Sequence, residues 1–261
     1  MNSTKNQKLF PSERQKKIRR IALEKGILRI SELADNFAVS EMTIRRDLEI
    51  LEDSGFVERT FGGAILSEQA SFELSYSSRL ESNVEAKKAI AKYAASLIYD
   101  GDTIALDSST TALALAEELQ DRKITVLSNS LGVAQLLRSA RPRLILSGGY
   151  LRQLTGGFVG PLALKTIADL RIDHAFISSK GLILNDALFD SDLDEIEVKR
   201  AMINSAAKLT AIVDASKFAR SALGKIIALS DIDLLITDNS IATKYLKELK
   251  EIGLNYHIAR V

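Results

Sequence analysis

From residue 84 to the C-terminus, short apolar runs alternate with longer segments of helical periodicity. The apolar runs predict strands at residues 103–106, 124–127, 144–146, 175–177, 209–213, 234–237 and 256–261. The segments between them predict helices at residues 86–98, 112–119, 131–138, 162–170, 195–207 and 241–251. Because the strands are short and uniformly apolar, both faces of their sheet need to be covered. The sequence therefore predicts an α/β domain with a mainly parallel sheet and helices on both faces.

Small, polar or cationic residues follow these strands, in the loops where sheets of this kind bind ligands. We predict an effector site from the residues Asp107, Ser108, Ser109, Thr110, Thr111, Asn129, Ser130, Gly148, Gly149, Gly157, Lys180, Asp214 and Lys217. The backbone N–H groups at the helix start after Ser109 would cradle an anion, and Lys180 and Lys217 would suit a phosphate. Taken singly, each loop has a plainer interpretation: a helix cap, a turn, or a solvated lysine.

The N-terminal part of the chain carries a different pattern. Residues 30–37 predict a short helix with Ser31 as its N-cap, and Ser40 caps a second helix after the two-residue turn 38–39. An earlier helix is expected to open with a capping box at residues 12–15. Two short helices joined this tightly are a helix-turn-helix, whose second member normally enters the major groove of DNA.

A small hairpin is predicted directly after that second helix. Residues 56–60 alternate like a strand, the glycines at 62 and 63 allow a tight turn, and residues 64–66 form the returning strand. A hairpin at this position is the wing of a winged helix-turn-helix. The predicted DNA-binding residues are Ser40, Met42, Thr43, Arg45, Arg46, Arg59, Gly62 and Gly63.

Charge supports DNA binding only weakly. Residues 1–66 hold 12 basic and 10 acidic residues, against 35 and 34 in the whole chain, so the slight positive excess lies in the front part. Residues 14–20 contain five basic residues and no acid. An Arg-Arg pair on a helix is often only a solvated face. The order of capped helix, tight turn, Arg pair and Gly-Gly hairpin is what favours DNA binding.

Composition excludes several other classes. There are no cysteines and only two histidines, so we expect no disulfide, no thiolate chemistry and no metal site. No run reaches the roughly eighteen apolar residues that a membrane span needs, and the polar start is unlike a secretory signal. These features fit a cytoplasmic protein. We expect three parts: a DNA-binding domain at 1–66, a serine-rich linker at 67–83, and an effector-binding and oligomerisation domain at 84–261.

The order of these motifs resembles the DeoR family of transcriptional regulators over residues 11–261. The front signature is similar to residues 39–48, followed by Arg59 and residues 62–64. The rear signature is similar to residues 107–111, 129–130, 148–149, 157–160, 173–176, 197–199 and 214–218. One departure is Ser109, which stands where the family commonly has glycine.

The resemblance implies a sensor related in fold to ribose-5-phosphate isomerase and coenzyme A transferases, and a homodimer or homotetramer. It also implies a phosphorylated sugar or similar phosphometabolite as effector, without a further cofactor, and control of carbohydrate-metabolism genes, most simply as a repressor that binds double-stranded operator DNA. Glu197 or Asp214 would then accept hydrogen bonds from sugar hydroxyls. The alternative is an isomerase-like enzyme with an accessory DNA-binding segment, since Asp107, Asp214 and Lys180 suit acid–base chemistry. We predict no catalytic residue.

Overall fold

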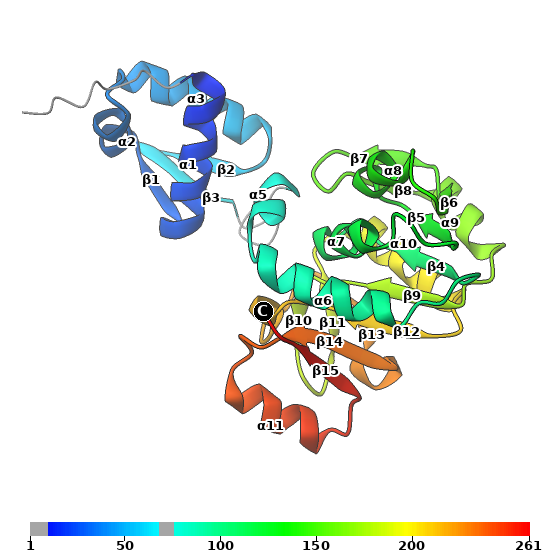
Figure 1. Cartoon of the computed structure of the whole chain (residues 1–261). Coiled ribbons are helices and arrows are strands. Elements are labelled where there is room, and N and C mark those ends of the chain that lie inside the picture. Colours follow the sequence, from blue (N-terminus) through cyan, green and yellow to red (C-terminus); the bar gives the residue numbers. More distant parts are fainter. Residues whose placement is uncertain (1–9, 68–75) are drawn as a thin grey trace, which may run out of the picture. The chain divides into compact units, whose positions relative to one another are not determined.

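The computed structural model describes residues 10–67 and 76–261. It divides into two compact units, Met1–Leu74 and Ser75–Val261 (Figure 1). As predicted, the first is a winged helix-turn-helix and the second is built on a parallel sheet.

Within residues 10–67, the front unit contains three helices and a three-stranded antiparallel sheet of order β1-β3-β2. Its elements are α1 (Pro11–Lys25), β1 (Ile27–Arg29), α2 (Ile30–Phe37), α3 (Glu41–Asp53), β2 (Val57–Thr60) and β3 (Gly63–Leu66). The strand β1 has no counterpart in the sequence-based prediction and pairs with β3. A Cβ added at Gly63 would lie 1.9 Å from the backbone oxygen of Leu28 in β1. Glycine is therefore required at residue 63 for this close approach between strands.

One of the three expected helix caps is present. Ser40 caps α3 and accepts a hydrogen bond from the backbone N–H of Thr43 at 3.2 Å. The prediction for residues 12–15 was wrong, because α1 begins at Pro11, a residue whose fixed φ suits the first helical turn. The prediction for Ser31 was also wrong: α2 begins at the buried Ile30, directly after β1, without a side-chain cap.

The core of the front unit contains a buried ion pair beside its apolar side chains. Ile18, Ile44 and Leu48 are fully buried there. Next to them, Arg14 Nε of α1 lies 2.5 Å from Asp47 Oδ2 of α3, and both side chains are almost inaccessible. Arg14 therefore holds α1 against α3 and is not part of the exposed basic surface that the sequence of residues 14–20 suggests.

The second unit is organised by a seven-stranded sheet of order β15-β14-β12-β9-β4-β5-β6, and every pair in it is parallel. Its strands are β4 (Thr103–Leu106), β5 (Thr125–Ser128), β6 (Arg143–Leu146), β9 (His174–Ile177), β12 (Leu209–Ile212), β14 (Leu234–Asp238) and β15 (Tyr256–Ala259). The main helices are α6 (Val84–Ser96), α7 (Thr110–Glu118), α8 (Leu131–Leu137), α9 (Pro161–Ala168), α10 (Leu193–Asn204) and α11 (Thr243–Glu251). All of these strands and helices overlap the predicted ones.

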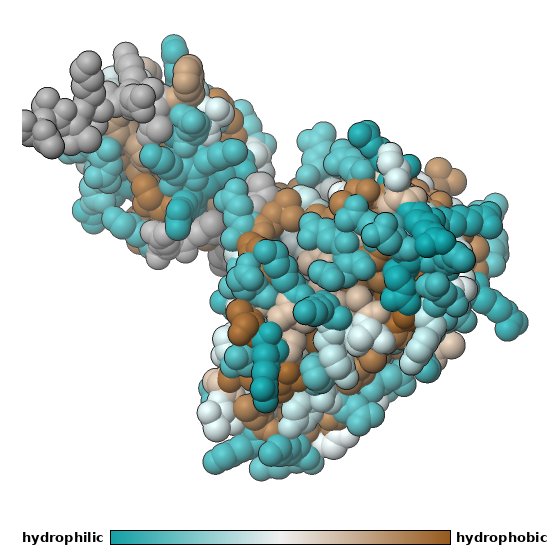
Figure 2. Space-filling view, viewed as in Figure 1, coloured by the Kyte–Doolittle hydropathy of each residue, from teal (hydrophilic) through white to brown (hydrophobic). Residues whose placement is uncertain are grey.

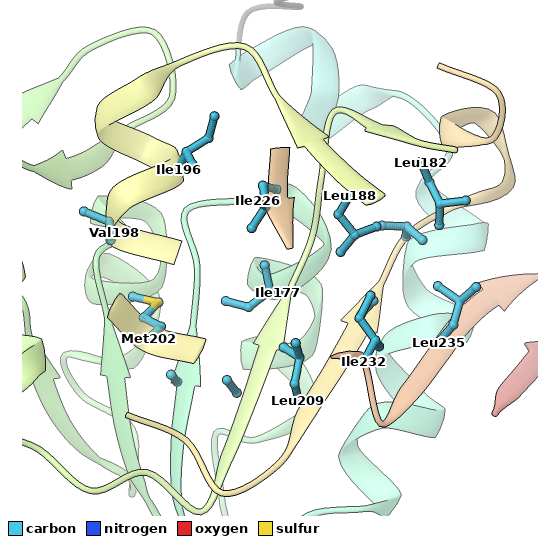
Figure 3. Close-up of a cluster of buried hydrophobic side chains, with 14 of the residues drawn as sticks. Ile177, Leu182, Leu188, Ile196, Val198, Met202, Leu209, Ile226, Ile232 and Leu235 are labelled. Atoms are coloured by element: carbon cyan, nitrogen blue, oxygen red, sulfur yellow. The ribbon is translucent and has the colours of Figure 1, made fainter. Parts of the chain in front are cut away.

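Helices cover both faces of this sheet, as its uniformly apolar strands require. On one face, α6, α7 and α8 pack on side chains such as Ile104 and Phe176. On the other face, α9, α10 and α11 pack on a second cluster. Figure 3 shows part of this cluster, where Ile177 and Leu235 of the sheet lie in one group with Met202 of α10.

Several short elements were not predicted. They are α5 (Tyr76–Glu81), the hairpin β7 (Tyr150–Arg152) and β8 (Gly157–Val159), and the antiparallel strands β10 (Gly181–Leu182), β11 (Ala187–Asp190) and β13 (Gly224–Ala228). The helix α5 lies inside the segment 67–83 that the sequence suggests is a linker. On the face seen in Figure 2, apolar residues are scattered among hydrophilic ones. Among the described helices, none has both the length and the apolarity needed to cross a membrane.

Candidate functional site

The order of the sheet strands marks one place where a ligand pocket is expected. From β4 the chain continues outward through β5 and β6, and it then returns to β9 on the other side of β4. Open α/β sheets bind ligands at such a reversal, beyond the carboxyl ends of the strands. Here Asp107 follows β4, Ser178 follows β9, and Asp214 closely follows β12.

A pocket is present at this edge of the sheet. It is lined by Arg79, Ser82, Lys87, Ser108, Ser109, Thr110, Thr111, Thr155, Ser178, Ser179, Lys180, Asp190, Glu195, Lys199, Asp214 and Lys217. Five of these side chains are cationic and three are carboxylates. The excess of cations makes the pocket suited to an anion.

A buried ion-pair network lies at the base of the pocket. Lys199 Nζ of α10 lies 2.5 Å from Asp190 Oδ2 and 3.3 Å from Asp107 Oδ2, and it donates to the Ser178 carbonyl at 2.9 Å. Burial by itself would lower the pKa of Lys199, but Asp190 and Asp107 outweigh it and raise this pKa. Burial alone would likewise raise the pKa of Asp190, but Lys199 lowers it. Each partner thus keeps the other charged, and the network holds α10 and the strand ends together.

A second carboxylate faces the same pocket from the start of α10. Glu195 accepts hydrogen bonds from Ser108 Oγ at 2.8 Å and from Thr155 Oγ1 at 2.5 Å. A Cβ added at Gly157 would lie 2.8 Å from Glu195 Oε1. Glycine at residue 157 therefore leaves room for the carboxylate, which can accept further hydrogen bonds from a hydroxylated ligand.

Arg79, Lys87 and Lys217 are cations that line the same pocket. Burial lowers the pKa of Lys87 to about 8; Asp214 acts in the opposite direction, and Lys217 and Arg79 lower it further. Burial is also the main cause that lowers the pKa of Lys217. Placing two such lysines and Arg79 together costs free energy, and a bound anion would offset that cost.

Hydrogen-bond donors complete the pocket at the start of α7. Ser109 caps this helix and accepts from the Ala112 N–H at 3.0 Å, while Thr110 and Thr111 in the first turn line the cavity. A helix start attracts anions. The Ser179 hydroxyl is also buried here and has no hydrogen-bond partner. Buried hydroxyls are usually paired, so Ser179 is an independent sign that a polar ligand belongs in this space.

Seven of the fourteen predicted effector residues line the pocket, and seven do not. The lining residues are Ser108, Ser109, Thr110, Thr111, Lys180, Asp214 and Lys217. Asn129, Ser130, Gly148 and Gly149 follow β5 and β6, which lie farther out in the sheet. Asp107 and Gly157 lie behind the lining, next to Lys199 and Glu195 respectively.

Glu197 is the remaining predicted residue outside the pocket. It is exposed, whereas Glu195 in the same helix is buried and lines the cavity. Two residues along an α-helix correspond to a rotation of about 200°, so the two side chains point to opposite faces. The helical phase of α10 thus places Glu195, and not Glu197, at the pocket.

Several lining residues were not predicted. Arg79 and Ser82 belong to the segment interpreted as a linker, and Lys87 lies in a helix with no loop motif. Asp190, Glu195 and Lys199 are charged residues that are buried. The sequence offers one sign that two of them lie together: positions 195 and 199 are four residues apart and therefore share a helix face.

The front unit presents the predicted DNA-contacting residues on α3 and the hairpin β2–β3. Met42, Arg45 and Arg46 are exposed on α3, and Arg45 lies 3.4 Å from Glu41 one turn earlier. Ser40 is exposed at the helix start, Thr43 is half-buried, and Arg59 is exposed on β2. Gly62 has a φ of +87° in the exposed turn, but Gly63 is buried against β1 and cannot reach a partner.

Metal and histidine chemistry find no support in the described residues. Within residues 10–67 and 76–261, no group of three or more His, Cys, Asp or Glu side chains could hold a metal ion. His174 is buried in β9, with Nε2 lying 2.7 Å from Thr210 Oγ1. Burial lowers the pKa of His174 to about 4, so it remains neutral and serves packing.

Two family models match the chain in the same order as its two units. A DeoR-like helix-turn-helix domain matches residues 14–70, and a DeoR C terminal sensor domain matches residues 82–239. Together these matches cover most of the chain.

Known proteins give the same result. The chain is 36% identical to the HTH-type transcriptional regulator GolR of Listeria innocua, over 96% of this chain and 100% of that protein. It is also 36% identical to the lactose phosphotransferase system repressor of Lactococcus lactis, over 87% and 90%. A partial structural likeness to ribose 5-phosphate isomerase A from Neisseria gonorrhoeae, with 16% identity and a TM-score of 0.39 over 53% and 54% of the chains, carries no argument about activity.

Proposed function

Because the chain belongs to the DeoR family of transcriptional regulators, we propose that it is a repressor that binds operator DNA and responds to a phosphorylated sugar or similar phosphometabolite. The main support for an anionic effector is the cationic pocket at the strand reversal, which also contains a buried, unpartnered Ser179 hydroxyl. The relatives GolR and the lactose phosphotransferase system repressor are regulators by name. This favours a regulator over the isomerase alternative.

The buried network also argues against the isomerase alternative. Both carboxylate oxygens of Asp107 are engaged: Oδ1 accepts from the Ser109 N–H, and Oδ2 accepts from the Ser178 N–H beside Lys199. A general base must be within reach of the proton that it removes. Asp107 is fully buried behind the lining, so its position supports a structural role.

On the DNA side, α3 is proposed as the recognition helix. Arg45 would reach a guanine edge and Arg46 a phosphate, with Met42 and Thr43 near base edges. Arg59 and the Gly62 turn on the hairpin would contact the backbone or the minor groove. A homodimer, or a pair within a tetramer, would present two such helices to two half-sites.

In the effector pocket, the anionic group would lie between the start of α7 and the cations Lys87 and Lys217. Glu195, and not Glu197, would accept hydrogen bonds from sugar hydroxyls. The Ser179 hydroxyl would donate a hydrogen bond to a sugar oxygen. The effector changes DNA affinity only if it binds one arrangement of the protein more tightly than another.

Replacing Arg45 with alanine is expected to weaken operator binding by about 1–3 kcal/mol, because a bidentate contact to a guanine edge would be lost. The measurement is a titration of promoter fragments from the source genome at fixed salt. Preference at one base pair should also relax.

The matched control is Arg138→Ala, which removes one exposed arginine of the sensor. It should leave operator affinity unchanged. Equal affinity of Arg45→Ala and the unmodified protein would contradict the role of Arg45. If no promoter fragment is bound in a sequence-selective, salt-sensitive manner, the DNA-binding proposal itself fails.

Anion binding is expected to weaken as the pH rises through about 8. Lys87, whose pKa is lowered by burial to about 8, loses its charge there and attracts anions less. Sulfate is the suitable probe because its charge does not change in this range. Its dissociation constant, obtained from thermal shifts, should rise about tenfold per pH unit above about pH 8.

The substitution Lys87→Gln should weaken sulfate binding near neutral pH and remove this pH dependence. The control Lys88→Gln changes the neighbouring exposed lysine of α6 and should retain both the sulfate affinity and its pH dependence. A pH slope that persists in Lys87→Gln would assign the titration to Lys217 and contradict the role of Lys87.

A further inference from the structure

The helix α5 is attached to the second unit in an unusual way. Its described side chains do not belong to the two apolar clusters on the faces of the seven-stranded sheet. Leu80, its one large aliphatic side chain, is 38% exposed. Apolar burial is the main source of stability for most helices, so α5 depends on other contacts for its position.

Those other contacts come from the walls of the pocket. Lys87 Nζ donates to the carbonyl oxygens of Arg79 and, at 3.2 Å, of Leu80. At the other end of α5, the Tyr76 N–H donates to the carbonyl of Leu154, the residue before the lining Thr155. Several of the groups that hold α5 are thus groups that an anion in the pocket would contact or neighbour.

The turn after α5 is attached to the same wall. Asn83, which has a φ of +50°, donates through Nδ2 to Asp214 Oδ1 at 2.9 Å and to Ser216 Oγ at 3.2 Å. Asp214 lines the pocket beside Lys217. The exit turn is therefore seated on polar side chains, and α5 is held by polar contacts together with Tyr76, whose ring end lies against Gly132 of α8.

Arg79 extends from this helix into the cavity. Its side chain is buried and lines the pocket with Lys87 and Lys217. Burial is the main cause that lowers the pKa of Lys87 and of Lys217; Asp214 acts in the opposite direction, and the nearby Arg79 lowers both pKa values further. An anion among them would replace repulsion with attraction and would favour the seated position of α5.

We propose that Arg79 is a direct ligand of the anionic effector and that a bound effector stabilises the seated position of α5, which is the position against the pocket that this structure shows. This proposal rests on the anion-binding function proposed above. In the sequence, α5 comes directly after residues 68–75, which connect it to the winged helix-turn-helix. Under this proposal, the seating of α5 alters operator affinity, provided that the two seating states differ in effector affinity.

Hydrogen–deuterium exchange of the full chain tests this proposal, with sodium sulfate compared against sodium chloride at matched ionic strength. Sulfate is expected to slow amide exchange in residues 76–83 several-fold, since a better-seated helix opens less often. Peptides from α11, which contributes no residue to the pocket, serve as the internal control and should not change.

The substitution Arg79→Gln should weaken sulfate binding by at least about tenfold and remove the protection of residues 76–83. Arg79→Lys should restore part of the binding. Arg171→Gln, which changes an exposed arginine before β9, is the matched control and should behave like the unmodified protein. Operator affinity at matched ionic strength should respond to sulfate in the unmodified protein and not in Arg79→Gln.

The outcomes separate the two proposals. If sulfate binds and protects residues 108–112 but not 76–83, or if Arg79→Gln binds sulfate normally, the inference about α5 is wrong and the anion pocket stands. If operator affinity responds equally in both proteins, the response is a salt effect and α5 does not transmit the signal. If the unmodified protein binds neither sulfate, phosphate nor any sugar phosphate, the pocket proposal fails and this inference fails with it.

Discussion

Replacing Lys199 with methionine is expected to destabilise the second unit by about 3–5 kcal/mol. The substitution leaves Asp190 and Asp107 buried without their shared cation, and each of them is at most 2% exposed. Removing one partner of a buried ion pair costs far more than the pair contributes in total, because the remaining charge has no water to solvate it. Urea unfolding followed by far-UV circular dichroism measures the change.

A matched control separates this effect from loss of positive charge. Lys165→Met changes an exposed lysine on α9 and should alter the free energy of unfolding by about 0.5 kcal/mol or less. The double substitution of Lys199→Met with Asp190→Asn should recover part of the loss, since one uncompensated charge disappears. Equal stability of Lys199→Met and Lys165→Met would contradict a buried ionic network at the base of the pocket.

The secondary structure of the second unit could be predicted because its signals are local. Each strand of the large sheet is a short apolar run, and each intervening helix has its own periodicity. The strands β10, β11 and β13 pair in a separate antiparallel sheet. β10 has only two residues, whereas β11 and β13 contain short apolar runs at 187–189 and 226–228. Such a run does not by itself indicate which sheet it joins. Their apolar side chains complete a core that only the assembled fold defines.

The pocket was only partly predictable because strand order is not a local property. Loops after all strands carry suitable residues, but only those after β4, β9 and β12 meet at the reversal of the sheet. Asn129 and Gly148 have the right chemistry and follow strands farther out. Conversely, Arg79 carries no motif, and a polar segment without periodicity gives no sign that it covers a pocket.

The recognition helix shows how one short motif combines two kinds of residue. Arg45 and Arg46 are exposed, whereas the adjacent Asp47 is 2% exposed and paired with Arg14. From the sequence alone, all three are charged residues of the helix that is predicted to read DNA. Helical phase decides between them, since Asp47 shares the inner face with Ile44 and Leu48.

Asp47→Ala is therefore expected to destabilise the front unit by about 3–5 kcal/mol, because Arg14 would remain buried without its carboxylate. A single core in a unit of this size supplies no more than about 3–5 kcal/mol, so most of the front unit should be unfolded. Amide exchange in residues 11–66 should accelerate strongly, while exchange in the seven-stranded sheet stays unchanged. All DNA binding should be lost, whatever the sequence of the fragment.

Two comparisons make this result specific to the ion pair. Asp53→Ala removes an exposed carboxylate at the end of the same helix and should leave both exchange and DNA binding intact. Arg46→Ala should weaken DNA binding and reduce its salt dependence, since a phosphate contact is lost, but should leave amide exchange unchanged. If Asp47→Ala instead behaved like Arg46→Ala, with a folded front unit and weaker DNA binding, Asp47 would belong to the DNA-contacting surface. The separation of an outer, DNA-reading face from an inner, stabilising face on α3 would then be wrong.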